Sequence, residues 1–297
     1  MAGICLFAAA FLLQRRLAAA GVVLVFLLGA SGVSFAGEKS LPGGPVTGPL
    51  PWSGRPEVEQ LKRQYGTPVL MAAYRASLPE PVLAEAYNVG HAAKMLAGMV
   101  VQPGEVFSQN KRLGPYTRTR GFQDGPMYVG NRIVPTEGGG VCKIASVLYN
   151  VVVLSNLQVV ERHPHSMTVP YVPPGQDATV AYGLYDFRFK NTSGGPILIW
   201  AEMVGDTLYI AFYGREKPPR VNWHHEILSR SKFWTEVRSN PLLPPGTEKE
   251  IVPGQEGVAV RSWLTIETED GRVVRRDLGV DYYRAGPRVV ERGPCSN

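Results

Sequence analysis

The sequence predicts an α+β domain followed by a small all-β module, and three observations support this prediction. Hydrophobic residues make up 44% of the 297 positions and charged residues 19%, which is typical of a globular chain with a core. Residues 84–100 and 141–154 have apolar side chains at helical spacing. Later segments alternate apolar and polar side chains between Gly- and Pro-rich turns. We therefore expect a helix carrying a cysteine at its N-terminus, packed on an antiparallel sheet and followed by the β module.

Residues 1–36 have the pattern of a secretory signal peptide. An arginine pair precedes an apolar run at 17–36, which ends in a small-x-small cleavage pattern. The run is about 20 residues long, enough to span a bilayer, so an uncleaved N-terminal anchor is the alternative. Either interpretation places residues 37–297 outside the cytoplasmic membrane, and the chain contacts a membrane only if the segment is uncleaved. We expect an exported protein of the cell envelope or the extracellular space.

Changes in composition divide the rest of the chain. Residues 37–58 are rich in Gly and Pro without a hydrophobic period, which predicts a linker. An α+β domain is expected at 59–216 and a Pro-bounded connection at 217–242. Residues 243–297 then form a β module, whose hairpin turns at Asp270-Gly271.

The expected elements of the α+β domain follow in chain order. An additional helix is predicted at 57–66, ahead of the two helical segments already named. Strands are predicted at 157–161, 167–172, 178–182, 186–190, 197–203 and 207–213, the last two as an antiparallel hairpin.

The charge distribution excludes one class of partner. The formal net charge is +6, but no basic stripe with interleaved aromatic residues is present, so we predict no nucleic-acid partner. The positive charge supports at most a weak affinity for an anionic cell surface. No sequence motif indicates a cofactor, and none is predicted.

The most informative segment is the glycine run that leads into the helix at 141–154. It brings Cys142 to the first turn, where unpaired N–H groups and the helix dipole favour a thiolate and lower the thiol pKa from about 8.5. Backbone N–H groups around Gly140–Lys143 would form an oxyanion hole, and Gly139, Gly140 and Lys143 are expected to bind substrate. The Lys143 ammonium either lowers the thiol pKa further or is a solvated helix residue.

Candidate partners for the cysteine follow it along the chain. His163 and His165 come roughly 20 residues later, a separation that a turn and a strand can close, and Asp177 and Asp186 come after them. The order Cys, His, acid is that of papain-like and transglutaminase-like thiol enzymes. We predict Cys142 as nucleophile and His165 as base, with His163 as second choice, and Asp177 or Asp186 to orient the imidazole.

Each of these residues also has a plainer interpretation. Cys142 can be a small buried hydrophobic residue, or it can form a disulfide with Cys295. His163 and His165, joined by Asp177 or Cys142, could hold zinc, although no diagnostic zinc spacing is present.

Two further residues are candidates for substrate binding. Arg162 would bind a ligand carboxylate through both guanidinium nitrogens, or would pair with Glu161 or Asp186 as structural support. Tyr171 belongs to a group of alternating aromatic residues, which either line a groove for sugar or peptide or pack in the core.

The chain resembles the VanW family over about residues 84–215. The motifs that carry the resemblance are PGEVFSQN (103–110), GPYTRTRGF (114–122), GGGVCKIASVLYN (138–150), ERHPHS (161–166), YVPPGQDATV (171–180), DFRFKN (186–191) and PILIWA (196–201). The family usually has Gln after the cysteine and Ser or Thr two residues later, where this chain has Lys143 and Ala145. An activity that depends on that Gln would be altered here.

The resemblance implies an envelope location and a link to peptidoglycan or its stem peptides, without an established reaction. Residues 243–293 resemble the G5-like β modules of cell-wall proteins, which are thought to be adhesive or sugar-binding. Together with the residues, this favours an exported thiol enzyme with peptidase-like or transpeptidase-like activity on wall peptide or amide bonds. The alternatives are a non-catalytic accessory protein that binds peptidoglycan or glycan, and a membrane-anchored scaffold.

Overall fold

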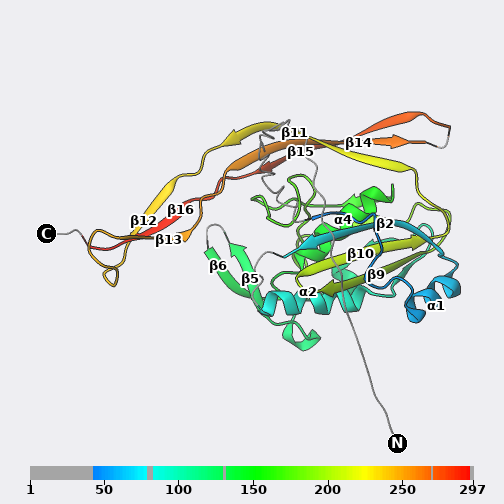
Figure 1. Ribbon diagram of the computed structural model, residues 1–297, viewed down its shortest axis with the longest axis horizontal. Helices are drawn as coiled ribbons and strands as arrows, with labels where there is room; N and C mark the ends of the chain where they lie inside the picture. Colours follow the sequence, from blue (N-terminus) through cyan, green and yellow to red (C-terminus); the bar gives the residue numbers. More distant parts are fainter. Residues whose placement is uncertain (1–42, 79–82, 130–131, 269, 295–297) are drawn as a thin grey trace, which may run out of the picture. The chain divides into compact units, whose positions relative to one another are not determined.

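The computed structural model describes residues 43–78, 83–129, 132–268 and 270–294 (Figure 1). These residues belong to one compact unit, Ser40–Asn297. The predicted signal segment at 1–36 lies outside the described residues, as does Cys295. None of the helices in the described ranges is long and apolar enough to cross a membrane.

A five-stranded antiparallel sheet forms the centre of the first domain. Its strand order is β1-β2-β10-β9-β3. The strands are β1 (Gly43–Pro45), β2 (Val69–Ser77), β10 (Thr207–Gly214), β9 (Ile197–Val204) and β3 (Val100–Val101). The predicted hairpin between the last two strands of the domain is confirmed, because Thr207 pairs with Val204 across the turn.

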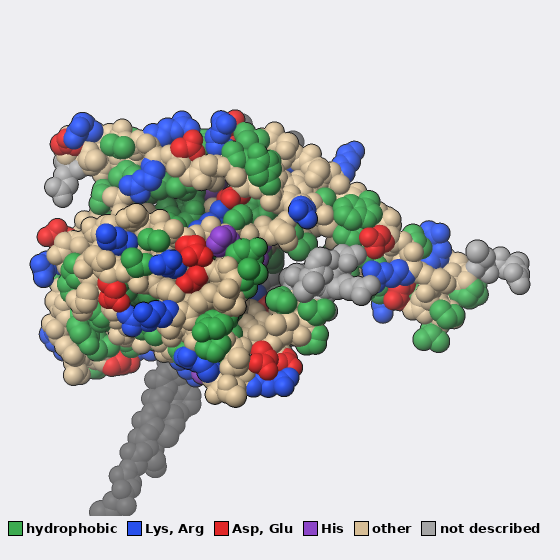
Figure 2. Space-filling view, turned by 180° about the vertical axis from the view of Figure 1, so that it is seen from behind, with side chains coloured by type: hydrophobic (Ala, Val, Ile, Leu, Met, Phe, Trp, Pro, Cys, Tyr) green, Lys and Arg blue, Asp and Glu red, His purple; other side chains and the backbone are tan. Residues whose placement is uncertain are grey.

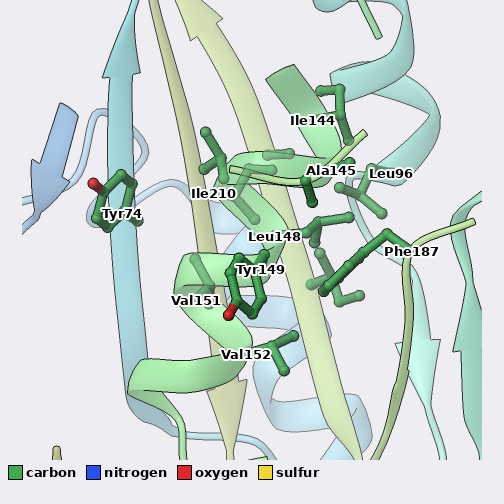
Figure 3. Packing of buried hydrophobic residues seen from close by; sticks show 14 of the residues in the cluster. Tyr74, Leu96, Ile144, Ala145, Leu148, Tyr149, Val151, Val152, Phe187 and Ile210 are labelled. Atoms are coloured by element: carbon green, nitrogen blue, oxygen red, sulfur yellow. The ribbon is translucent and has the colours of Figure 1, made fainter. Parts of the chain in front are cut away.

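The first domain also contains helices, some of which pack against this sheet. They are α1 (Pro56–Tyr65), α2 (Leu83–Leu96), the short α3 (Gln109–Leu113) and α4 (Cys142–Leu154), with a 3-10 turn at Arg118–Arg120. Helix α2 contacts β9, and α4 contacts β2 and β10. Ile144 and Leu148 of α4 share one buried cluster with Ile210 of β10 (Figure 3).

Helix α4 is buried on nearly all sides. Every residue from Ile144 to Val153 is buried, whereas the apolar stripe predicted from the sequence covered one face only. The side facing away from the sheet packs against the C-terminal module, where the ring of Tyr149 meets the ring of Trp223 edge-on at 5.2 Å between centroids. A helix that is buried on all sides requires such cover. The module therefore contributes to the core around α4.

Two small sheets and a long irregular segment complete the first domain. The first sheet has the order β4 (Val106–Ser108), β8 (Arg188–Lys190) and β7 (Gln158–Glu161), and the second pairs β5 (Asp124–Val129) with β6 (Arg132–Glu137). The strands predicted at 167–172 and 178–182 are wrong. These residues form loops, because prolines remove N–H donors and side chains take up backbone groups: Ala178 N–H, for example, donates to Ser146 Oγ at 2.9 Å.

The linker predicted at 37–58 is wrong from residue 43 onward. Strand β1 pairs with β2, and the fully buried indole of Trp52 donates to the Tyr213 hydroxyl at 2.7 Å. Leu50 and Val58 share this second buried cluster. Residues 43–58 are held by a few isolated apolar side chains. Because these side chains do not recur at a regular spacing, a search for periodicity does not find them.

The C-terminal module consists of two three-stranded sheets. The first has the order β11 (Arg220–Ser231), β14 (Gly257–Glu267) and β15 (Val273–Tyr283), all antiparallel. The second has the order β12 (Thr235–Ser239), β16 (Arg288–Arg292) and β13 (Glu248–Val252), with β12 and β16 parallel. The predicted hairpin around residues 270–271 is confirmed by the pairing of β14 with β15.

The connection predicted at 217–242 is wrong, because β11 and β12 occupy most of it. Strand β11 runs along β14 over its whole length. The module begins at β11, earlier than its glycine pattern suggested. The prolines taken as the start of a connection directly precede this strand. Over the visible face of the molecule, basic, acidic and apolar side chains are interspersed (Figure 2).

Candidate functional site

A tight glycine turn leads into α4. Gly140 has a φ of +106°, in the region that favours glycine, and a Cβ at that position would lie 2.9 Å from Glu85 Cγ. A Cβ at Gly139 would lie 2.3 Å from the backbone of Gly125. The turn therefore needs glycine both for its conformation and for the close approach of two backbones. It ends directly before Cys142, the first residue of α4.

The backbone N–H groups of this turn are mostly paired. Those of Gly139, Val141 and Lys143 donate to backbone carbonyls at 3.0–3.2 Å. Among the described residues, no acceptor is present for the N–H groups of Gly140 and Cys142. Among the described residues, these two N–H groups are therefore the donors left for the predicted oxyanion hole. The N–H of Gly139 instead bonds the Thr136 carbonyl within the turn.

Cys142 is a partly exposed, free thiol. Its Sγ lies 3.4 Å from Thr179 Oγ1 and accepts from the Val180 N–H at 3.5 Å. Burial by itself raises the pKa of the thiol, but the imidazole of His165 beside it, with Thr179 and Val180, lowers its pKa to about 7. Each of these groups stabilises the thiolate more than the thiol.

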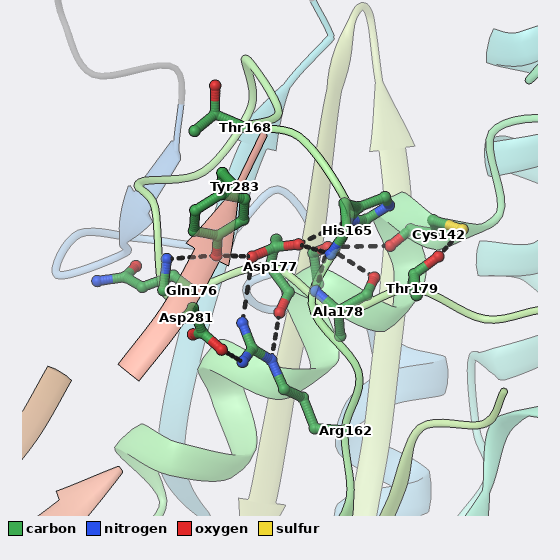
Figure 4. Close-up of polar contacts among 12 residues, drawn as sticks. Cys142, Arg162, His165, Thr168, Gln176, Asp177, Ala178, Thr179, Asp281 and Tyr283 are labelled. Atoms are coloured by element: carbon green, nitrogen blue, oxygen red, sulfur yellow. Dashed lines mark hydrogen bonds and ion pairs between the residues drawn. The ribbon is translucent and has the colours of Figure 1, made fainter. Parts of the chain in front are cut away.

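His165 bonds a buried carboxylate, that of Asp177 (Figure 4). Its Nδ1 lies 2.5 Å from Asp177 Oδ2, and its backbone N–H donates to the same oxygen at 2.7 Å. Burial lowers the pKa of the imidazole, but Asp177 and Cys142 outweigh this effect and raise its pKa to about 9. Asp177 thereby fixes the Nδ1 side of the ring.

Asp177 is almost fully buried and has several donors. Its Oδ1 accepts from Arg162 Nη2 at 3.1 Å and from the hydroxyl of Tyr283. Burial raises the pKa of this carboxyl, but the hydrogen bonds from His165 and Tyr283 and the charges of His165 and Arg162 hold its pKa below the ordinary value. The carboxylate is therefore ionised at neutral pH and fixed on both oxygens.

Arg162 does not face an open groove. Its Nη1 donates to Asp281 at 2.6 Å and its Nε to the Asp177 carbonyl at 2.7 Å. The predicted partners Glu161 and Asp186 are wrong, because Arg162 pairs with Asp177 and Asp281 instead. Each of its three guanidinium nitrogens bonds one of these partners, so Arg162 supports the carboxylate.

The second-choice residues lie apart from the cysteine network. His163 bonds Glu161 at 3.2 Å, and its ring packs against Tyr185. Asp186 accepts from the Asn110 N–H at 2.9 Å and from Ser108.

The rings of His163 and His165 have different acidic partners. Within the described residues, no group of three or more His, Cys, Asp or Glu side chains is arranged to hold a metal ion. The alternative disulfide is wrong for Cys142, whose thiol is free.

Lys143 and Tyr171 are structural neighbours rather than open binding groups. The Lys143 ammonium forms an ion pair with Glu85 and lies 4.9 Å from the centre of the Tyr171 ring. Tyr171 is buried in the main core. The prediction of a solvated Lys143 is wrong, because α2 supplies a carboxylate that draws the side chain inward.

Three contributors to the site were absent from the sequence prediction: Thr179, Asp281 and Tyr283. Thr179 had a weak local signal, since it lies two residues after Asp177. Tyr283 contacts Asp177 across 106 residues, and Asp281 contacts Arg162 across 119. No local pattern marks such a pairing.

A cavity of about 370 Å³ adjoins the loop that contacts the thiol. Val180 of this loop binds Cys142, and the residues that follow it line the cavity. The side chains at its wall include Asn110, Lys111, Glu161, Tyr182, Tyr185 and Asp186.

Comparisons with known proteins match both parts of the chain. The family described as VanW like protein matches residues 84–213, and the G5 domain matches residues 228–294. Over 130 residues the chain is 42% identical to "Uncharacterized protein YoaR" of Bacillus subtilis (strain 168), which covers 44% of this chain and 43% of that protein. Over 137 residues it is 24% identical to "Vancomycin B-type resistance protein VanW" of Enterococcus faecalis (strain ATCC 700802 / V583), covering 44% of this chain and 50% of that protein.

The chain thus spans half or less of the length of these curated relatives. Among solved structures, "IgA1 Protease G5 domain structure" matches 27% of this chain and 98% of that chain, with 23% identity and a TM-score of 0.18. The first matched segment contains Cys142, His165 and Asp177, and the second contains Asp281 and Tyr283.

Proposed function

The chain carries a VanW-like domain followed by a G5 domain, and from this premise we propose that it is a thiol enzyme of the cell envelope that acts on peptide or amide bonds of peptidoglycan. The observation that carries the proposal is the 2.5 Å contact between His165 Nδ1 and Asp177 Oδ2, together with a Cys142 thiol whose pKa the neighbouring imidazole lowers. A buried acid that orients a histidine next to a partly exposed cysteine is the arrangement of an activated nucleophile.

The protonation states fit this role. With a thiol pKa of about 7 and an imidazole pKa of about 9, the predominant form between these values is a thiolate beside an imidazolium. The thiolate is the nucleophilic form of cysteine, and the imidazolium is a ready proton donor. Asp177 stabilises the imidazolium by accepting its Nδ1–H.

The reaction is acyl transfer in two steps. Cys142 Sγ attacks the carbonyl carbon of a wall peptide bond, and the N–H groups of Gly140 and Cys142 donate to the oxyanion that forms. His165 gives its proton to the departing amine, the C–N bond breaks and a thioester remains. Water or a second amine then attacks the thioester carbonyl while His165 takes up its proton. The C–S bond breaks, Cys142 leaves as the thiolate, and the product is either a hydrolysed or a newly cross-linked peptide.

The two domain matches support the choice of substrate. One relative is named for vancomycin B-type resistance, and G5 domains are associated with binding to peptidoglycan or glycans. The G5 domain would hold the enzyme on the wall while the peptide binds at Cys142. In this proposal the N-terminal segment directs export, and no cofactor takes part.

The test is turnover of purified muropeptides by the full chain, followed by mass spectrometry. We expect Cys142→Ser and Cys142→Ala to lose activity and His165→Ala to lose about 10²–10⁴-fold, as removal of a general base does. His163→Ala is the matched control and should retain turnover, because its ring pairs with Glu161. Equal turnover by Cys142→Ala and wild type would refute the proposal.

A non-catalytic binding function is the second candidate, and the cavity favours it. Tyr182 and Tyr185 at its wall provide aromatic surfaces suited to sugar or peptide. If wild type binds peptidoglycan, releases no product and has an unreactive Cys142, this second function replaces the first. Binding should then be weakened by Tyr182→Ala, whose side chain is exposed, and unaffected by Cys142→Ala.

A further inference from the structure

The loop that carries Asp177 is held by the C-terminal module. Gly175 donates its N–H to the Tyr283 hydroxyl at 2.7 Å, and Gln176 bonds His225 Nε2 at 2.8 Å. Gly175 has a φ of +89°, and a Cβ there would lie 2.5 Å from Ser262 Oγ. The loop is therefore pressed against strands β11, β14 and β15 with no room for a side chain at its tip.

The Tyr283 hydroxyl acts as both an acceptor and a donor of hydrogen bonds. Its side chain is buried, and its hydroxyl oxygen accepts from the Gly175 N–H. The single hydroxyl proton is then free to point at Asp177 Oδ1, which it contacts. One side chain of the module thus fixes both the loop backbone and the carboxylate that the loop presents.

Arg162 makes a second bridge between the domains. Its guanidinium lies between Asp177 at 3.1 Å and Asp281 of β15 at 2.6 Å. Asp281 lies two residues before Tyr283 on β15. One strand therefore supports the Asp177 carboxylate twice, directly through Tyr283 and indirectly through Asp281 and Arg162. Both act on Oδ1, whereas Oδ2 serves His165.

We propose that the C-terminal module is part of the catalytic machinery: Tyr283 is a positioning residue that holds Asp177 in the orientation that His165 requires. This inference rests on the proposed thiol function of Cys142. Without the Tyr283 hydroxyl, Oδ1 keeps only the contact with Arg162 at 3.1 Å, so the carboxylate is fixed less firmly and Oδ2 can shift relative to the imidazole. The imidazolium loses its acceptor, and the thiolate loses the charge that stabilises it. The VanW-like domain and the G5 domain then work as one enzyme rather than as a catalyst with a separate adhesive module.

The experiment measures alkylation of Cys142 by iodoacetamide against pH in the full chain, followed on the peptide that contains Cys142. Tyr283→Phe removes only the hydroxyl, and Tyr282→Phe is the matched control on the exposed side of the same strand. We expect Tyr283→Phe to raise the midpoint of the alkylation pH profile by at least one pH unit. The alkylation rate at pH 7 then falls about fivefold or more. Tyr282→Phe should overlay the wild type.

A second variant guards against a folding defect in Tyr283→Phe. Gln176→Ala removes the bonds that this side chain makes with His225 and Tyr74 and leaves Tyr283 intact. It should shift the midpoint in the same direction by a smaller amount, with an unchanged circular dichroism spectrum.

The outcomes separate the two proposals. A low wild-type midpoint that neither Tyr283→Phe nor Gln176→Ala moves would overturn the positioning role and leave the thiol enzyme standing. A wild-type midpoint near 8.5, the ordinary value for a free thiol, would overturn both.

Discussion

His165 Nδ1 lies 2.5 Å from Asp177 Oδ2, and these two residues are only 12 positions apart in the chain. The contact closes the loop between them, because Asp177 Oδ2 also accepts the backbone N–H of His165 at 2.7 Å. Asp177 therefore orients both the ring and the backbone of the residue that it serves. The predictions below follow from this relationship and from the groups around it.

Replacing Asp177 by Asn removes the charge that holds His165 protonated. We expect the midpoint of Cys142 alkylation to rise and the rate at pH 7 to fall at least fivefold. Because Arg162 then faces an uncharged partner in a buried position, unfolding should cost about 3–5 kcal/mol less, measured by urea denaturation. Asp186→Asn is the control, since Asp186 bonds Ser108 and Asn110 instead; an equal effect from both variants would contradict the assignment.

Thr179 stabilises the thiolate through its hydroxyl, 3.4 Å from Cys142 Sγ. Thr179→Val keeps the shape of the side chain and removes the donor. We expect a higher alkylation midpoint and a rate at pH 7 about twofold to threefold lower, which corresponds to loss of one hydrogen bond of about 1 kcal/mol or less. A midpoint that does not move would show that Thr179 donates elsewhere.

The pH profile of turnover should be bell-shaped. Below about pH 7 the Cys142 thiol is protonated and cannot attack, and above about pH 9 the His165 imidazole is neutral and cannot protonate the leaving amine. The limbs of kcat/KM for a muropeptide, measured from pH 5 to 10, should follow these two pKa values. Alkylation needs no proton donor, so its rate should rise as the thiol ionises near pH 7. It should not fall again above pH 9, where kcat/KM falls.

Lys143 occupies the place where the VanW family usually has Gln, and its ammonium is paired with Glu85. Because that charge is already neutralised, Lys143→Gln should leave the alkylation midpoint of Cys142 within about 0.3 pH unit of wild type. Glu85→Gln, which frees the ammonium, should instead lower the midpoint. A marked rise in Lys143→Gln would mean that the lysine charge does reach the thiol.

Trp52 anchors residues that the sequence indicated as a linker. It is fully buried and hydrogen-bonded to Tyr213, so Trp52→Ala should lower the free energy of unfolding by about 3–5 kcal/mol. Trp234→Ala removes an indole that is half exposed in the C-terminal module and should change it by about 1 kcal/mol or less. Thermal unfolding followed by circular dichroism distinguishes the two, and equal losses would contradict the packing of residues 43–58.

Much of the fold could be predicted because it depends on neighbours along the chain. The helix from Cys142 to Leu154 and the hairpins β9-β10 and β14-β15 have periodic apolar patterns and turn residues within a few positions of each other. The strands expected at 167–172 and 178–182 failed for the opposite reason. Their backbone groups bind side chains such as Ser146, which lies far outside the window in which alternation is read.

The sequence by itself determined the compartment hypothesis, the two domain resemblances and a short set of candidates: one cysteine, two histidines and two aspartates. Only the tertiary structure chose among them. It brought His165 and Asp177 to Cys142, paired His163 with Glu161, and placed Tyr283 and Arg162 on the carboxylate. Periodicity and glycine turns are local properties that a sequence displays directly. Contacts across more than 100 residues arise only when both domains have packed, and a buried charge such as Asp177 is stable only where that packing supplies its partners.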